Sequence, residues 1–174
     1  IWIRDRGGDR PILFSYFLNN GLEFIIRLTK RRKLIYNGQE LSVSEIAKKV
    51  KPEHQSLVTK IKKNKPVKVL YRYGAVKVQY QDGNKVGDMW LVVTKAENKG
   101  YCWLLTNKPF DNAFQAATQT FQAYGFRWKI EEYHRHIKQC YRLEDIQVKT
   151  FNGLQSMLAI LTVAMHIIYR ELSA

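Results

Sequence analysis

The residues with the clearest chemical pattern lie in the stretch YGFRWKIEEYHRHIK, residues 124–138. If this stretch is a helix with about 100° per residue, Tyr124, Arg127, Glu131 and Lys138 fall within a sector of roughly 60°. The opposite side of the helix carries Phe126, Ile130, Tyr133 and Ile137. The sequence therefore predicts an amphipathic helix whose polar face presents one carboxylate, two cations and a phenol.

This polar face has the groups needed for phosphoryl transfer on a polyanion. A carboxylate is the oxygen ligand that magnesium prefers, and Arg and Lys bind phosphate oxygens. The alternative is a solvated face on which Glu and Arg pair along the helix. Glu132 lies about 100° from Glu131 around the helix, so we expect it to point elsewhere. His134 and His136 are not four residues apart, which argues against a helical His–His metal pair.

The spacing Tyr-x2-Arg-x3-Glu-x6-Lys resembles the YREK signature of DDE transposases from bacterial cut-and-paste insertion sequences. Two other segments resemble motifs of the same family. Asp5-Arg6-Gly7-Gly8-Asp9 is similar to the strand-end D-R-x-x-D motif that holds its second catalytic Asp. Residues 103–106 are similar to its W-L-L-T segment. The three motifs occur in the family order and extend over most of the chain.

The resemblance implies a site in which Asp5 and Glu131 bind Mg²⁺, with Mn²⁺ as a possible substitute. Tyr124, Arg127 and Lys138 would hold a DNA phosphate beside these carboxylates, and Arg27 would meet another phosphate. Trp103 would stack on a base flipped out of the duplex, and Trp128 would play a similar part or pack under Arg127. The implied activity is cutting DNA at the ends of a mobile element and joining the 3′ hydroxyl to target DNA, by a protein that dimerises on DNA.

Each of these residues also has an ordinary structural interpretation. Without the resemblance, Asp5 is more typical of a helix or turn cap than of a metal ligand, and a Trp in a strand, such as Trp103, is usually part of a core. Arg27 ends an apolar run and would reach solvent there. The residues alone leave these alternatives open.

Composition favours a nucleic-acid partner. The 174-residue chain has 29 Lys+Arg against 15 Asp+Glu, a formal net charge of +14. Such an excess attracts polyanions, most simply nucleic acid, and the resemblance implies double-stranded DNA. We find no lipidation motif and no uninterrupted apolar run of about 20 residues, so we expect no membrane partner. Two cysteines and no signal peptide indicate a cytoplasmic protein, and the resemblance implies a prokaryotic, nucleoid-associated one.

A strand–helix–strand unit begins the chain. We expect a strand over residues 1–4 that ends at Asp5, a helix Pro11–Asn19 with Asp9 as its N-cap, and a strand over residues 22–28. Such units place their strands in parallel, and ligands gather at the carboxyl ends of parallel strands. The cations of residues 30–33 follow, and we expect them to contact the DNA backbone rather than form a solvated loop.

The middle of the chain has the alternating pattern of a β-sheet. Hairpin turns are predicted at Asn37-Gly38 and Asp82-Gly83, and Ser42 with Glu45 forms a capping box for one short helix. Outward cations either line a DNA path or solvate a two-sided sheet: Lys60, Lys62, Lys63, Lys65, Lys68, Arg72 and Lys77. Beyond this region we expect helices capped by Asp111 and Asn152, the second of them packing against the core.

We therefore predict an α/β fold with an RNase H-like core and a β-rich insertion. Residues 1–33 and 109–174 would form the core, and residues 34–108 the insertion. The family uses three carboxylates and places the first upstream of Asp5, so we expect the chain to be an inactive fragment that lacks this Asp and the first strands. The alternatives are a non-catalytic DNA-binding remnant and a metal-dependent nuclease without strand transfer.

Overall fold

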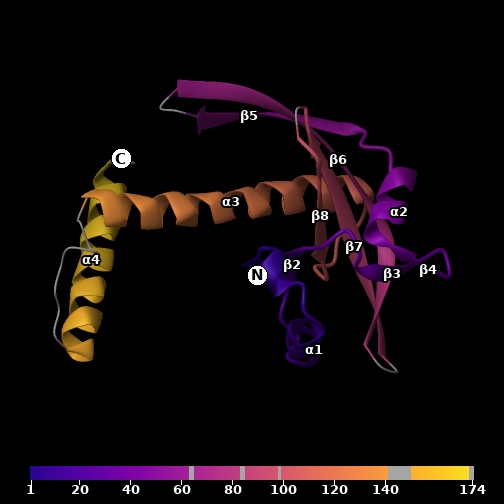
Figure 1. Ribbon diagram of the computed structural model, residues 1–174, viewed down its shortest axis with the longest axis horizontal. Coiled ribbons are helices and arrows are strands. Elements are labelled where there is room, and N and C mark those ends of the chain that lie inside the picture. Colours follow the sequence, from indigo (N-terminus) through magenta and orange to yellow (C-terminus); the bar gives the residue numbers. More distant parts are fainter. Residues whose placement is uncertain (63–64, 83–84, 98, 141–149, 173–174) are drawn as a thin grey trace. The chain divides into compact units, whose positions relative to one another are not determined.

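A computed structural model describes residues 1–62, 65–82, 85–97, 99–140 and 150–172 (Figure 1). Within those ranges the side chains of residues 60–62, 65, 82, 85, 128–130, 132–140, 165 and 168–172 are not described. The chain divides into two compact units, Ile1–Ile130 and Glu131–Ala174, and each is treated by itself.

The first unit opens with the predicted parallel strand–helix–strand arrangement. Strand β1 (Trp2–Arg4) is followed by the short 3₁₀ helix η1 (Arg6–Gly8), helix α1 (Pro11–Asn19) and strand β2 (Phe24–Arg27). β1 and β2 are parallel, with Trp2 opposite Phe24 and Arg4 opposite Ile26. The prediction of a βαβ unit is confirmed, and Asp5 follows directly after β1.

The middle of the chain is rich in strands, as predicted. Its elements are β3 (Lys33–Tyr36), β4 (Gln39–Ser42), α2 (Val43–Lys49), β5 (His54–Lys62), β6 (Lys65–Asp82), β7 (Lys85–Ala96) and β8 (Tyr101–Thr106). The hairpin turn at Asn37-Gly38 is confirmed by φ values of 51° and 76°, which suit a type I′ turn. The capping box of Ser42 and Glu45 is also present. The second predicted turn falls between Asp82 and Lys85, which pair with each other, and lies outside the described residues.

All eight strands belong to one sheet. Its order is β1-β2-β8-β7-β6-β3-β4, and β5 pairs with β6 off this path. β2 runs antiparallel to β8, with Arg27 opposite Leu104. Strands from the predicted core and the predicted insertion therefore share a continuous hydrogen-bonded sheet in a mixed α/β fold. The division at residues 33 and 109 stays a prediction.

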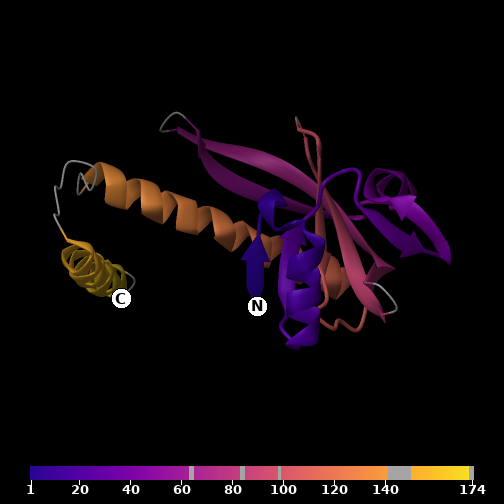
Figure 2. The ribbon, with the colours of Figure 1, turned by 60° about the horizontal axis from the view of Figure 1, so that its bottom comes forward.

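The long strand β6 changes the face that it buries partway along its length. Before Gly74, Tyr71 and Tyr73 pack against Phe121 of helix α3 (Ala113–Cys140), and the Tyr73 and Phe121 rings are stacked at 4.7 Å. After Gly74, Val78 and Tyr80 are buried with Phe14 of α1 in the larger core. Because side chains alternate along a strand, odd and even positions lie on opposite faces. Helices α1 and α2 thus cover one face of the sheet, and the first half of α3 covers the other (Figure 2).

Gly74 allows another part of the chain to cross the sheet at this change of face. A Cβ atom at this position would lie 2.7 Å from the Lys51 carbonyl oxygen and 3.3 Å from the Pro52 Cα atom. The segment between α2 and β5 therefore packs directly on the β6 backbone. Only glycine permits this approach without displacing the backbone.

Three predicted helix caps are wrong by one or two residues. Arg10, not Asp9, is the N-cap residue of α1, because the Asp9 carboxylate is turned toward the segment after β2. Asn112, not Asp111, accepts the Gln115 N–H at the start of α3, at 2.9 Å. Thr150, not Asn152, accepts the Gly153 N–H at the start of helix α4 (Phe151–Leu172), at 3.1 Å. Neighbouring polar residues compete for a cap, and local sequence did not separate them.

The second unit contains the end of α3 and helix α4. The prediction that α4 packs against the core concerns both units together and stays a prediction. Among the described helices, none combines the length and the apolar character needed to cross a membrane.

We expect Gly74→Ala to lower the free energy of unfolding by about 1–3 kcal/mol, because the new methyl group overpacks against backbone. Gly87→Ala in β7 is the matched control, since its Cβ atom would meet only Met89 Cε at 3.8 Å. That change should alter stability by less than about 1 kcal/mol. Urea unfolding of both variants measures the difference. Equal effects would contradict the close crossing at Gly74.

Candidate functional site

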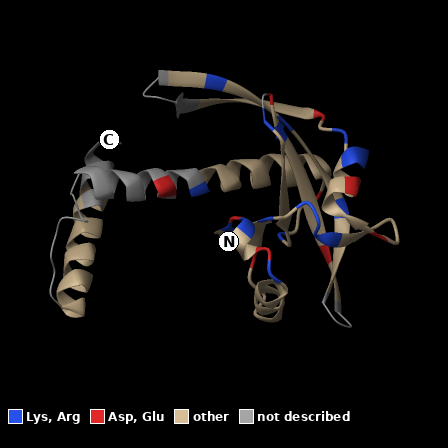
Figure 3. Cartoon of the chain, viewed as in Figure 1, with Lys and Arg blue, Asp and Glu red and all other residues tan. Residues whose placement is uncertain are grey.

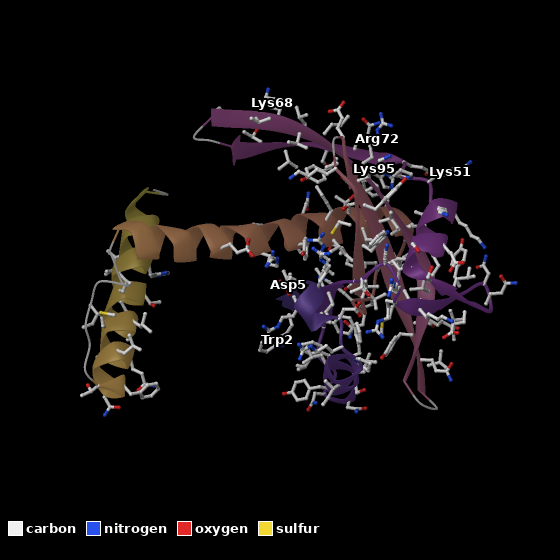
Figure 4. The ribbon with its side chains drawn as sticks, in the orientation of Figure 1. Trp2, Asp5, Lys51, Lys68, Arg72 and Lys95 are labelled. Carbon is white, nitrogen blue, oxygen red and sulfur yellow. The ribbon has the colours of Figure 1, made fainter. Side chains whose placement is uncertain are left out.

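Asp5 is held at the carboxyl end of β1 by a tight turn. Its Oδ1 atom accepts the Gly7 N–H at 2.9 Å, and its carbonyl accepts the Gly8 N–H at 2.9 Å. Gly8 is buried, and a Cβ atom there would lie 2.6 Å from the Arg4 Cβ atom. Asp5 itself is exposed (Figure 4). The glycines of the motif therefore fix the Asp5 carboxylate at the strand end while leaving it accessible, and Asp5 also fulfils the turn-capping interpretation.

Three arginines from three elements gather on the α3 face of the sheet. Arg6 of η1, Arg27 of β2 and Arg127 of α3 all act electrostatically on the Cys102 thiol of β8. The Arg127 guanidinium carbon lies 5.8 Å from the centre of the Tyr124 ring. We call Arg6, Arg27 and Arg127, together with Tyr124 and Cys102, the arginine cluster. The structure thus brings together three of the predicted site residues: Tyr124, Arg127 and Arg27.

The cluster combines burial with positive charge. Burial raises the pKa of the Tyr124 phenol above its ordinary value, and the adjacent Cys102 adds to the rise, while Arg127 and Arg27 oppose it. Burial likewise raises the pKa of the Cys102 thiol, against the influence of Arg27, Arg6 and Arg127. Both groups are therefore neutral near pH 7, and the net charge of the cluster is positive. Such a cluster attracts an anion and holds guanidinium donors for its oxygens.

Sequence reasoning did not identify Arg6 or Cys102 as members of this cluster. Arg6 was visible as the residue after Asp5 in the strand-end motif. Cys102 had no chemical pattern of its own, and it enters the cluster only because β8 lies beside β2. Only strand pairing could have revealed it.

The remaining predicted residues on α3 are Trp128, which lies in the first unit, and Glu131 and Lys138, which lie in the second. Glu131 begins the second unit and is exposed. Lys138 and Trp128 lie in the same helix, and their side chains fall outside the described residues. The closeness of Asp5 and Glu131, which a shared metal ion requires, stays a prediction.

Trp103 lies on the other face of the sheet from the arginine cluster. Its ring is partly buried and packs against the larger core, whereas its neighbours Cys102 and Leu104 belong to the α3 face. Its indole N–H is buried and meets no hydrogen-bond acceptor within the described residues. The structure therefore does not bring Trp103 together with Tyr124 and Arg127, and its packing supports at least a structural contribution.

The cations of residues 30–33 divide into two kinds. Arg32 donates to the Asp9 carboxylate at 2.6 Å and to the Asp9 carbonyl at 3.1 Å, and the Asp9 side chain is only 1% exposed. Lys33 pairs with Glu40 at the surface. Lys30 and Arg31 are exposed. A DNA-backbone role for this run therefore rests on Lys30 and Arg31, because Arg32 ties the segment after β2 to Asp9.

The residues of the first unit fit one part of a magnesium site. Asp5 offers an exposed carboxylate at a strand end, and hard cations take such oxygen ligands. Among the described residues, no group of three or more His, Cys, Asp or Glu side chains could hold a metal ion. Asp9 accepts hydrogen bonds from Arg32 and Thr29 instead. A complete site therefore needs further carboxylates beside Asp5.

These features define a mixed α/β domain with an accessible strand-end carboxylate and a positively charged cluster of arginines. Residues 2–167 match the sequence model of the family described as "Transposase DDE domain", so the chain belongs to this family. DNA transposition is the function of the family, DNA is its partner and divalent metal ions are its general cofactor. A search among curated proteins gave no match.

Reactivity of Cys102 tests the geometry of the arginine cluster. We expect its thiolate to form at higher pH in the folded chain than in the urea-unfolded chain, because burial raises the pKa of the thiol. Arg27→Gln should raise this midpoint further, since Arg27 opposes the rise, whereas Arg27→Lys should leave it nearly unchanged. The rate of iodoacetamide alkylation against pH, in a Cys140→Ser background, gives the midpoint. If Arg27→Gln leaves the pH midpoint of Cys102 alkylation unchanged, Arg27 does not lie close to Cys102 and the arginine cluster is wrong.

Proposed function

We propose that this chain takes part in phosphoryl transfer on DNA, in which the ends of a mobile element are cut and joined to target DNA. The observation that carries the proposal is the arginine cluster beside the strand end of Asp5: Ile3 of β1, two residues before Asp5, packs on the same face of the sheet as Cys102 and Tyr124. Phosphoryl transfer needs little covalent help from the protein, so positioning and charge stabilisation supply most of the catalysis. The family membership of the chain supports the same reaction.

Asp5 and Glu131 would hold the magnesium ions, and manganese would substitute for magnesium. When bound, these ions would activate the attacking water or 3′ hydroxyl and stabilise the departing oxygen. The turn at Gly7 and Gly8 would keep the Asp5 carboxylate in position during this chemistry, because two backbone N–H groups bond to Asp5.

The arginine cluster would hold the phosphate at the strand end. Arg127 and Arg27 would donate to its oxygens, with Arg6 adding positive charge, and a guanidinium can do so bidentately. Tyr124 would support Arg127 by the contact between their side chains. Lys138 would add a further cation if α3 meets the DNA along its polar face. The partly buried neutral side chains of Tyr124 and Cys102 would reduce the water around the arginines, which strengthens their contacts with the phosphate.

We further propose that Trp103 holds a base displaced from the duplex end, with Trp128 as an additional aromatic contact near Arg127. The resemblance of residues 103–106 to the W-L-L-T segment of the family supports this role, although Trp103 lies on the face of the sheet opposite the arginine cluster. Stacking on an aromatic ring contributes about 1–3 kcal/mol per base.

The wider assignment follows from the same proposal. We propose that the strands β1 and β2 belong to an RNase H-like core into which the β-rich segment is inserted, and that two copies act together on two element ends. Joining of cut ends to target DNA distinguishes this function from that of a nuclease, and cutting in the presence of metal distinguishes it from that of a DNA-binding remnant.

Glu131→Gln should abolish metal-dependent cutting of DNA while changing DNA affinity little, because glutamine keeps the size of the side chain and loses the charge that binds metal. Glu132→Gln is the matched control, since this residue lies about 100° further around the helix. A gel assay of nicked and joined products with Mg²⁺, beside a binding titration, separates the two effects. Equal loss in both variants would remove Glu131 from the site.

Trp103→Ala should leave the first nick nearly normal and slow the later steps by roughly 5- to 150-fold, which corresponds to about 1–3 kcal/mol. Trp103→Phe should retain most of the later activity, because it keeps an aromatic ring. A time course on an end-labelled duplex measures each step, and urea unfolding reports stability. If Trp103→Ala instead blocks the first nick or unfolds the protein, Trp103 acts only as core.

A further inference from the structure

The paired strands β5 and β6 carry a basic surface away from the arginine cluster. β5 pairs with β6 from His54 opposite Tyr73 to Lys62 opposite Lys65, and β7 reaches only as far along β6 as Tyr71. Beyond that point β5 and β6 continue as a two-stranded ribbon, as Figure 1 shows. We use the name ribbon face for the side of this ribbon and of β7 that carries Lys68, Arg72 and Lys95.

Strand register places these three cations on one face. Arg72 lies directly opposite Lys95, and Lys68 is four residues before Arg72 on the same strand. Side chains an even number of residues apart lie on the same face of a strand. Figure 4 shows Lys68 and Arg72 following one another along β6, with Lys95 beside them. The opposite face carries Tyr71 and Tyr73, which pack on Phe121 of α3.

The cations of the ribbon face are available to a ligand. Lys68, Arg72 and Lys95 are all exposed, and among the described residues none of them forms an ion pair. Lys95 lies 5.2 Å from the ring centre of Tyr101, which is 45% exposed. The exposed carboxylates nearest in sequence are Glu53 and Glu97, at the ends of β5 and β7. Residues 54–59 and 66–72 of the two strands contain Lys68 and Arg72 and no Asp or Glu (Figure 3).

We propose that the ribbon face binds the phosphate backbone of duplex DNA outside the strand end held by the arginine cluster. This inference rests on the proposed function, since it assigns the chain a second contact with the same DNA. The contact is independent of base sequence, because Lys and Arg on phosphate oxygens position a duplex without reading its bases.

The spacing of Lys68 and Arg72 favours duplex DNA over a membrane. Four residues of extended strand separate Lys68 from Arg72 by about 13 Å along β6. The major groove of B-DNA is about 12 Å wide, which is close to this interval. Cations at the two ends of this interval can reach phosphates on both sides of one groove. A membrane surface offers no such spacing.

The test compares two variants of the chain with equal loss of charge. Lys68→Gln with Arg72→Gln changes the ribbon face, and Lys48→Gln with Lys49→Gln changes exposed cations of α2. Fluorescence anisotropy with a random-sequence duplex gives affinity over a range of salt concentrations. The salt slope is the slope of the logarithm of the binding constant against the logarithm of the salt concentration, and each lost phosphate contact reduces its magnitude by about 0.9. The slope of the ribbon variant should therefore fall by about 1.8, and that of the α2 variant should stay nearly unchanged. Urea unfolding confirms that both variants fold.

If both variants bind DNA with equal salt slopes, the proposal for the ribbon face fails and the proposed function stands. An unaltered chain that binds no duplex would overturn the ribbon face together with the proposed function. Phosphatidylserine vesicles form the third arm of the test. If the ribbon variant loses vesicle binding but keeps its salt slope on DNA, the surface serves a membrane and the proposal fails.

Discussion

The change of buried face along β6 is the constraint on which the first unit depends. An 18-residue strand cannot bury the same face throughout, because α3 covers one side of its first half and α1 and α2 cover the other side of its second half. The crossing of Lys51 and Pro52 over Gly74 marks the exchange. No register shift is needed, since pairing with β7 continues unbroken from Tyr71 to Asp82. The apolar alternation simply moves from odd to even positions.

This exchange separates two kinds of surface. On the α3 face, β2 and β8 lie together, so Arg27 and Cys102 meet Tyr124 and Arg127 of the helix. On the other face, the segment after α2 packs on β6 at Gly74. The part of β6 before Gly74 carries exposed cations on that face, among them Lys68 and Arg72. The arginine cluster is partly buried and compact, which suits a single phosphate. The ribbon face is open and extended, which suits a length of backbone.

The strand-end motif combines two separate tasks in five residues. Asp5 points its carboxylate toward solvent while its backbone closes the turn with Gly8. Asp9, which resembles Asp5 in type, is buried and binds Arg32 and the Thr29 N–H. A buried carboxylate requires such partners, since removing one member leaves an uncompensated charge. One aspartate is therefore available for chemistry, and the other anchors the segment that leads from β2 to β3.

The sequence by itself determined the elements whose signals are local: the parallel βαβ start, the Asn37-Gly38 hairpin, the Ser42 capping box and the strand pattern of β6 to β8. Periodicity and turn chemistry depend on neighbouring residues, so they can be read without the fold. Motif resemblance also predicted Asp5, Arg27, Tyr124 and Arg127. Only the tertiary structure decided that Arg6 and Cys102 belong to the arginine cluster and that Asp9 binds Arg32. It also decided that Trp103 packs against the larger core, on the opposite face of the sheet. Those outcomes depend on strand order and on which helix covers which face, and contacts between distant segments leave no periodic trace in the sequence.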